Sequence, residues 1–171
     1  TWSDNTSYVR TTLVGQLALY VTMYSPLQMA ADLPENYKKF NDAFQFIKDV
    51  PCDWSQSIYL EAEPADYITV ARQDKNSNDW YIGGKCDENG HKSVLKLDFL
   101  DKDYVYDCTI YADAKGADYK NNPKAYKITH KKVKKGDVLK LTMAPGGGFA
   151  VSLEARWNGE EHAEQLTKVN N

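Results

Sequence analysis

The chain divides near residue 54 into two parts whose apolar residues follow different periods. In the first part the apolar positions recur every four residues, at Val9, Leu13, Leu17 and Val21. This spacing predicts an α-helix from Val9 to Tyr24. The segment Asp4–Thr6 supplies good N-cap residues, and Pro26 is expected to end the helix. The second half of the helix is apolar nearly all round, which predicts burial on more than one side.

The remainder of the first part is typical of half an α/β repeat. The apolar run Leu27–Ala31 favours a buried strand, and the loop Asp32–Tyr37 follows it. Asn41 or Asp42 is expected to cap a second helix that stops before Pro51. A parallel strand needs neighbours on both edges, and this part supplies one strand alone. It is therefore not expected to form a domain by itself.

The second part shows the period of two that is typical of β-strands. We expect strands at Ile58–Glu61, Tyr67–Arg72, Trp80–Gly83, Leu95–Phe99, Tyr104–Tyr111, Tyr126–His130, Val138–Met143 and Phe149–Glu154. Asn89-Gly90 indicates a hairpin-type turn. About eight short strands without an intervening helical pattern predict an antiparallel sandwich or barrel. The tail after Ala155 has no strong pattern and is expected to be frayed or weakly helical.

The predicted fold is mainly β, an antiparallel β-sandwich preceded by a small α/β segment. The expected divisions are residues 1–54, 55–155 and a tail at 156–171. With 171 residues the chain is too short for a complete (β/α)8 barrel, which takes about 250 residues.

Composition and charge exclude several classes of protein. The chain is 42% hydrophobic and 26% charged, which is too apolar and too evenly charged for a disordered chain. No stretch approaches the roughly 18–20 apolar residues that span a bilayer. The net charge is −3, with acid and base mixed along the chain. We therefore expect neither nucleic acid nor a membrane as a partner.

Cysteines and histidines give no sign of a metal or redox site. Cys52, Cys86 and Cys108 match no zinc or redox spacing and are expected to be small core residues. His91, His130 and His162 have no partner at ligand spacing, so no metal site is predicted. The chain begins at Thr1 without a methionine or a signal-peptide pattern, which favours a removed N-terminus or a longer parent chain.

Two other motifs have structural interpretations. Pro145-Gly-Gly-Gly leads into a strand and lacks the Lys-Ser/Thr of a phosphate loop, so a tight turn is expected. Lysines on both sides of Val133 form a basic hairpin tip, which is more typical of a solvated edge than of a binding patch. Neither motif provides a catalytic group, and no catalytic residue is predicted.

Aromatic residues of the predicted strands admit two interpretations. Trp80 and Tyr81 are candidates for stacking on sugar rings, as on the faces of sugar-binding sandwiches. Aromatic side chains also fill ordinary sandwich cores. A carbohydrate-binding module that uses these rings is thus an alternative function, with an α-linked oligosaccharide as its ligand.

Asp32 and Glu35 follow the predicted buried strand directly. Active sites of (β/α)8 barrels lie at the carboxyl ends of the strands, so these carboxylates are candidates for a substrate-binding rim. Residues of this type also begin helices and shape loops. The second carboxylate that glycoside hydrolysis requires has no candidate nearby.

Several strings together resemble the C-terminal end of glycoside hydrolase family 97. They are Tyr8–Leu13, Gln16–Tyr20, Tyr24–Tyr37, Phe44–Pro51 with Asp53-Trp54, and Ala144–Val151, and the most specific is Ser-Pro-Leu-Gln-Met-Ala-Ala-Asp-Leu-Pro-Glu at 25–35. The family comprises α-glucosidases and α-galactosidases, found largely in Bacteroides-type bacteria. The resemblance extends to about Leu153.

The resemblance implies that residues 1–54 are the last helix–strand–helix of a catalytic (β/α)8 barrel, with its eighth strand at Leu27–Ala31. The remainder would be the family's non-catalytic C-terminal β-domain. The family's catalytic glutamates and calcium-binding carboxylates lie upstream, and no position of this chain matches them. No cofactor is therefore expected in this chain, although calcium is expected in the parent enzyme.

By the same resemblance, the parent enzyme hydrolyses α-linked glucosides or galactosides, by an inverting or retaining route according to subgroup. Whether this chain is an enzyme depends on parts that it lacks, so its expected role is to pack on the barrel and to support oligomerisation. Self-association is expected through Leu13, Leu17 and Val21, which would form an apolar patch without the barrel. A location in the periplasm or outside a Gram-negative cell is implied.

Overall fold

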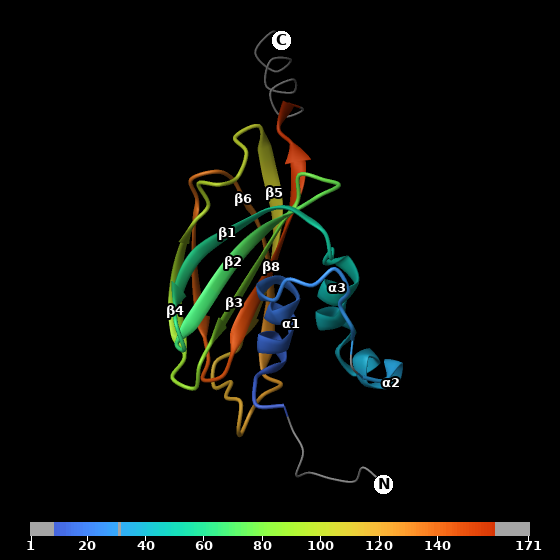
Figure 1. The fold of residues 1–171 in the computed structure, drawn as a ribbon, viewed down its shortest axis with the longest axis vertical. Helices are drawn as coiled ribbons and strands as arrows, with labels where there is room; N and C mark the ends of the chain where they lie inside the picture. The colour runs from blue at the N-terminus through green and yellow to red at the C-terminus, as the bar shows by residue number, and fades with distance from the viewer. Residues whose placement is uncertain (1–8, 31, 160–171) are drawn as a thin grey trace, which may run out of the picture.

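The protein is built in three layers (Figure 1). The computed structural model describes residues 9–30 and 32–159. A six-stranded sheet of order β1-β2-β3-β8-β5-β6 forms the middle layer, and a two-stranded sheet, β4-β7, covers one of its faces. The helices lie against the other face, on the right of Figure 1. Every strand pair is antiparallel.

All eight expected strands are present, which confirms the predicted antiparallel β-sandwich. They are β1 (Trp54–Glu63), β2 (Tyr67–Asp74), β3 (Trp80–Cys86), β4 (His91–Lys96), β5 (Tyr104–Asp113), β6 (Tyr126–Val133), β7 (Val138–Met143) and β8 (Gly148–Trp157). The helical elements are α1 (Leu13–Thr22), α2 (Pro34–Tyr37), the 3-10 helix η1 (Lys38–Phe40) and α3 (Asn41–Asp49). The strand expected at Leu95–Phe99 begins earlier, at His91, and ends at Lys96.

Two turns that suggested hairpins instead cross between the sheets. The Asn89-Gly90 turn leads from β3 in the large sheet to β4 in the small one, with Gly90 at a φ of 76°. The basic tip beyond Val133 leads from β6 in the large sheet to β7 in the small one. These crossings bring the apolar face of the small sheet over the large sheet.

The core between the two sheets is closed. Strand β8 lies at the centre of the large sheet, and Phe149, Val151 and Leu153 point from it into this core. Leu139 of β7 and Leu95 of β4 meet them from the small sheet, and all five side chains are fully or almost fully buried. This part of the fold follows directly from the alternation seen in the sequence.

The first helix differs from its prediction at its N-terminus. It begins at Leu13, and Thr12 caps it by accepting a hydrogen bond from the Gly15 amide at 3.0 Å. Val9 lies outside the helix and is exposed, while Asp4–Thr6 fall outside the described residues. Leu17 and Val21 are buried against the large sheet. The predicted apolar patch centred on Leu13, Leu17 and Val21 is therefore wrong, because the chain covers most of it with its own sheet.

The predicted strand at Leu27–Ala31 is also wrong. Residues 27–30 belong to no strand, and the side chains of Leu27 and Met29 are 71% and 77% exposed. Ala31 falls outside the described residues. The physical reason is that a strand requires hydrogen-bonding neighbours, and the large sheet lies on the far side of α1.

Helix α3 confirms the second predicted helix, including its end before Pro51. Its cap differs, because Phe40 is the N-cap residue and provides no side-chain bond. Asn41 and Asp42 lie in the first turn, where the Asp42 carboxylate accepts from the Ala43 amide at 2.8 Å.

The last strand extends past its predicted end. Strand β8 continues to Trp157, so the predicted tail begins within a strand, and residues 160–171 fall outside the described part. Within that part, no helix is long and apolar enough to cross a membrane.

Candidate docking surface

Small residues form the seat of α1 on the large sheet. The helix packs mainly on β3 and β8, where Gly83, Gly148 and Ala150 face it. A Cβ atom built on Gly83 would lie 2.7 Å from the Ala18 carbonyl oxygen and 2.8 Å from the Val21 Cβ. The sheet can therefore hold the helix this closely only because the side chain at this position is absent.

The N-terminus of α1 is bonded to the glycine-rich turn of the β-part. The Gly146 carbonyl accepts hydrogen bonds from the Thr12 amide at 3.2 Å and from the Thr11 hydroxyl at 2.8 Å. The Leu13 amide donates to the Pro123 carbonyl at 2.7 Å. The Gly147 amide donates to the Ala144 carbonyl at 2.8 Å, which confirms the predicted tight turn. The turn thus accepts from the Thr12 amide, and the loop before β6 accepts from the Leu13 amide, which a helix start leaves unpaired.

A buried carboxylate holds this turn in place. Asp113 of β5 accepts hydrogen bonds at one oxygen from the Ala144 and Gly148 amides, both at 2.9 Å. Burial raises the pKa of Asp113, against the opposing effect of these bonds. Nearby, burial lowers the pKa of Lys85, whose ammonium group donates to the Thr11 hydroxyl at 2.8 Å. The helix start therefore rests on a polar cluster supplied by β3 and β5.

Arg72 binds the other end of α1. Its Nε donates to the Val21 carbonyl at 2.6 Å, and its Nη1 donates to the Ser57 hydroxyl at the same distance. A cation is favourable at a helix C-terminus, where the carbonyls lack partners. Since both ends are bonded to strands, α1 is an integral part of the sandwich.

Helix α3 is attached through aromatic residues of the same sheet face. The Phe46 ring packs edge-on against Tyr81 and Tyr111, with centroid distances of 6.1 and 5.3 Å. The Tyr81 hydroxyl donates to the Asp49 carbonyl at 3.1 Å, and the Tyr126 hydroxyl donates to Asp42 at 2.6 Å. Burial raises the pKa of Tyr111 and of Tyr126 to about 12, so both rings remain neutral.

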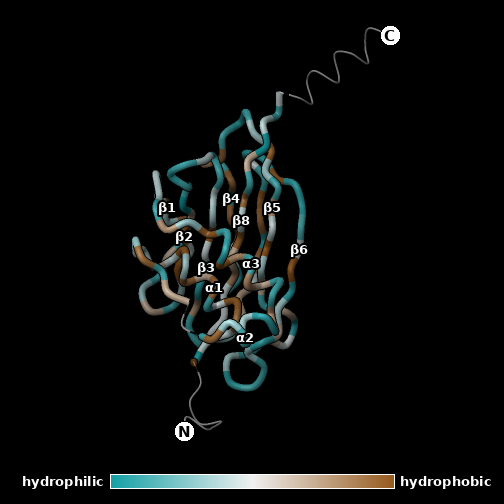
Figure 2. The backbone as a smooth tube through the Cα atoms, turned by 90° about the vertical axis from the view of Figure 1, so that its right-hand side faces the viewer, coloured by the Kyte–Doolittle hydropathy of each residue, from teal (hydrophilic) through white to brown (hydrophobic). Residues whose placement is uncertain are grey.

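The outward side of the helices forms an apolar groove. It has a volume of about 860 Å³ and lies between α1, α2, α3 and the segment after α1. Its lining includes Leu19, Tyr20, Met29, Phe44 and Ile47. Figure 2 looks onto this helical side, with the sheet behind it. A large exposed apolar surface of this kind marks a site of association with another protein surface.

The two rim candidates lie beside the groove in an exposed loop. One oxygen of Asp32 accepts hydrogen bonds from the Leu33 amide at 2.7 Å and from the Asn36 side chain at 2.6 Å. The bond to Asn36 is the main reason that the pKa of Asp32 is lowered. Glu35 lies in the first turn of α2 and is exposed. In this chain Asp32 shapes the loop, and a role of either residue at a substrate rim stays a prediction.

The two candidate stacking rings lie in the two cores. Trp80 is 3% exposed and belongs to the core between the sheets, while Tyr81 is 6% exposed and belongs to the core under the helices. Neither ring offers a face to a sugar. Alternation along β3 places Trp80 and Tyr81 on opposite faces of the sheet, but it does not show whether a face is covered. The small sheet covers one face and the helices cover the other.

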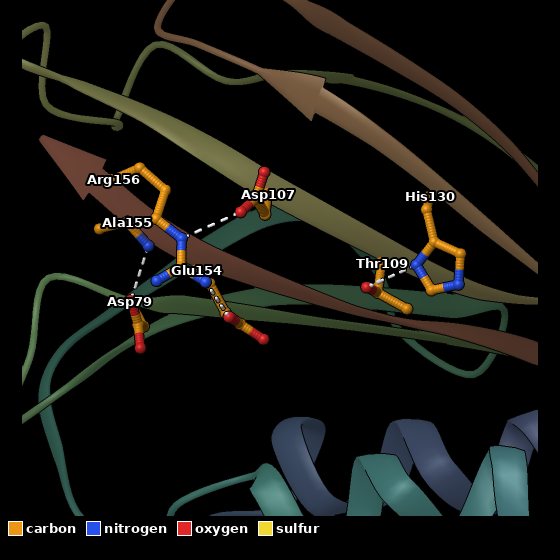
Figure 3. A network of polar contacts seen from close by, with 7 residues as sticks. All are labelled: Asp79, Asp107, Thr109, His130, Glu154, Ala155 and Arg156. Carbon is orange, nitrogen blue, oxygen red and sulfur yellow. Dashed lines mark hydrogen bonds and ion pairs between the residues drawn. The ribbon is translucent and has the colours of Figure 1, made fainter. Parts of the chain in front are cut away.

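An exposed polar network occupies the part of the large sheet beyond the helices (Figure 3). Arg156 contacts Asp107 and Glu154, both at 2.9 Å, and the Thr109 hydroxyl is hydrogen-bonded to the His130 ring at 3.0 Å. Exposed ion pairs of this kind contribute about 0–1 kcal/mol. The network is a solvated face, and His130 has a structural partner there.

A second polar cluster joins the two sheets and was not foreseen from the sequence. Glu61 of β1 accepts hydrogen bonds from Thr69 at 2.9 Å and from Ser93 of β4. The His91 ring stacks on Tyr67 and lies 3.5 Å from the same carboxylate oxygen. Among the hydrogen bonds of residues 9–30 and 32–159, none joins Ser93 to His91, so the cluster is no nucleophile–base pair.

The cysteines and acidic residues form no metal centre in the described part. Cys86 and Cys108 are buried core residues, as predicted, and Cys52 is half-buried; all three are free thiols. No group of three or more His, Cys, Asp or Glu side chains lies close enough to hold an ion there. The surface that the geometry singles out is thus the apolar groove.

Comparison with known proteins places this arrangement in a family. The profile described as "Glycosyl-hydrolase 97 C-terminal, oligomerisation" matches residues 53–154. A retaining α-galactosidase of Bacteroides thetaiotaomicron is 35% identical over 139 residues, which cover 81% of this chain and 20% of the relative. The chain therefore belongs to the family of glycoside hydrolase family 97 C-terminal domains, as the resemblance implied.

Solved structures agree with this assignment. A glycoside hydrolase family 97 enzyme of Pseudoalteromonas sp. strain K8, solved in complex with panose, is 47% identical with a TM-score of 0.84. The match covers 86% of this chain and 23% of that one. A β-arabinopyranosidase matches with 26% identity and a TM-score of 0.70, over 87% of this chain and 22% of its own. The chain thus corresponds to between a fifth and a quarter of the length of these relatives.

Proposed function

We propose that this chain is the non-catalytic C-terminal part of a longer family 97 glycoside hydrolase, and that its helical face docks on the catalytic barrel of that enzyme. The observation that carries the proposal is the apolar groove of about 860 Å³ on a molecule whose other core is closed. The length of the relatives supports it, since they extend far beyond the matched part.

The inner side of the helical layer packs on the sheet, and its outer side is the surface that docks. The buried side of α1 faces the sheet, whereas Leu19 and Tyr20 on its other side remain available to a partner. The exposed segment with Leu27 and Met29 is apolar and belongs to no strand. In the docked state this segment becomes the eighth strand of the barrel, with neighbours that satisfy its backbone groups.

We infer the substrate class of the longer enzyme from the relatives of this chain. The α-galactosidase and the panose complex both point to α-linked sugars as the substrate class. Calcium, bound by residues upstream of this chain, assists the reaction, and the enzyme acts in the periplasm or outside the cell. Calcium dependence of the longer gene product, and its recovery in the periplasmic fraction, test these two points.

An activity assay tests the non-catalytic role. The chain alone is incubated with nitrophenyl α-glucoside and α-galactoside in the presence of calcium. We expect no turnover above background, because the described residues offer no pair of carboxylates in a cleft that would serve as acid and nucleophile. Turnover at the rate of a family enzyme would overturn the proposal.

A pair of variants tests the docking face. Leu27→Asp with Met29→Asp places two charges on the groove segment, and Asp107→Asn with Glu154→Gln is the matched control on the exposed polar face. In the longer gene product we expect the first pair to lower the melting temperature and the control to leave it unchanged. Equal melting temperatures for both pairs would overturn the docking assignment.

A further inference from the structure

The outer face of the two-stranded sheet is open and unusual in its chemistry. Alternate residues of β4 and β7 point away from the core and form this face, which consists of Lys92, Val94, Lys96, Val138, Lys140 and Thr142. Val94 is 61% exposed and lies opposite Lys140, while Val138 is 44% exposed and lies opposite Lys96. Two exposed valines are thus surrounded by three lysines.

The lysines of this face have no partner within the described part of the chain. The ion pairs found there involve Lys75, His91 and Arg156, and no hydrogen bond uses the ammonium groups of Lys92, Lys96 or Lys140. Residues 91–143 contain twelve lysines against seven aspartates, in a chain whose net charge is −3. The face itself carries three of these lysines and no acidic side chain, so it is a patch of positive charge on an acidic protein.

The compensating negative charge lies at one end of the same sandwich. The β1–β2 turn and the β3–β4 turn are joined by a hydrogen bond from the Asp87 amide to the Asp66 carbonyl at 2.8 Å. Glu63 at the end of β1, Asp66 in the first turn and Glu88 in the second turn are exposed. Since the β3–β4 turn leads directly into β4, the acidic end adjoins the lysine face.

We propose that a second copy of this chain covers the outer face of the two-stranded sheet, with the acidic turns of each copy lying on the lysines of the other. A twofold axis perpendicular to β4 reverses the strand direction in the partner. The acidic turns of each copy then lie on the end of the partner's two-stranded sheet that carries Lys96, and the two symmetric contacts form together. The valines lie within this contact and lose their exposure to water.

Other edges of the sandwich fit a second copy less well. Strand β6 carries Lys127, Lys131 and Lys132, and two such edges would repel each other. Strand β1 is interrupted by two register shifts, which bend an edge away from flat pairing. The helical face is assigned to the barrel. This inference rests on the proposed function in one respect, that the barrel covers the helical face, and it gives a surface to the oligomerisation that the family description names.

Charge reversal and rescue test the surface. We expect sedimentation velocity to find a dimer for the chain, and Lys96→Glu with Lys140→Glu to weaken it by about tenfold or more, because like charges then face each other. Glu63→Lys with Asp66→Lys has the same expected effect. The four substitutions together restore the dimer. Lys102→Glu with Lys115→Glu, two exposed lysines on loops, is the matched control and leaves it unchanged.

Each outcome bears on the proposal. All altered residues are exposed, and circular dichroism of each variant verifies the fold. A monomeric chain, or a dimer that survives the lysine reversals, would overturn the inference. A dimer that is lost in Leu27→Asp with Met29→Asp but kept in Lys96→Glu with Lys140→Glu would place the contact on the groove and also overturn it. None of these results alters the test of barrel docking, which is measured on the longer gene product.

Discussion

The two faces of the six-stranded sheet carry different kinds of core. On one face the two-stranded sheet closes over Phe149, Val151 and Leu153, and the layers finish within this chain. On the other face α1 and α3 cover Tyr81 and Tyr111, but their outer sides end in an apolar groove. The first core is completed by this chain alone, whereas the helices over the second core leave an apolar surface open, which is the surface that we propose docks on the barrel.

The largest loss of stability is expected from a substitution in the closed core between the two sheets. Phe149→Ala removes a fully buried ring from the centre of the sandwich and should lower the free energy of unfolding by about 3–5 kcal/mol. Phe44→Ala, at a half-buried ring of the groove, is the comparison and should cost far less in this chain. Urea unfolding monitored by tryptophan fluorescence gives both values. Equal losses would contradict the distinction between the two cores.

A smaller loss of stability is expected from a substitution that weakens the contact between α1 and the large sheet. Gly83→Val inserts a side chain where the Ala18 carbonyl lies, and crowding of this kind costs roughly 1–3 kcal/mol. Ala62→Val, on the exposed side of the edge strand β1, is the matched control. Hydrogen exchange should show α1 losing protection in the first variant while the strands keep theirs. Unchanged protection of α1 would show that the helix does not need a glycine at position 83 to pack on the sheet.

The smallest effect is a pH dependence at the turn that joins the two layers. Burial raises the pKa of Asp113 in the folded chain, above the ordinary value of about 3.9. The folded state therefore binds this proton more readily than the unfolded state, and protonation favours folding. As the pH falls from 7 towards 4, wild type should gain stability relative to Asp113→Asn.

Urea midpoints at several pH values measure this difference. Asp98→Asn, which removes a carboxylate from an exposed position, is the control. A constant difference between wild type and Asp113→Asn over this range would show that the carboxylate is not perturbed by its burial.

The sequence predicted the strands well because alternation and turn residues act locally. It did not predict which sheet each strand joins: the Asn89-Gly90 turn has hairpin chemistry, yet it leads from one sheet to the other. Pairing depends on which apolar faces meet, and that information is not local. The Gly83-Gly84 pair within a strand was an available signal for a closely packed helix.

The helical part was predicted less well for a related reason. Thr12 caps α1 in place of Asp4–Thr6 because the seat on the sheet and the bonds to Gly146 fix where the helix can begin. Leu27–Ala31 has the composition of a strand but no neighbour in this chain. Trp80 and Tyr81 were candidates for sugar stacking because alternation alone does not reveal that both faces of β3 are covered.

Hydrogen exchange of the segment around Leu27 and Met29 tests the central claim most directly. The segment is measured in this chain alone and in the longer gene product, with β8 as the internal reference. We predict rapid exchange in the chain alone, where residues 27–30 belong to no strand, and strong protection in the longer product, where the barrel supplies their partners. Equally rapid exchange in both proteins would contradict the claim that the helical face docks on the catalytic barrel.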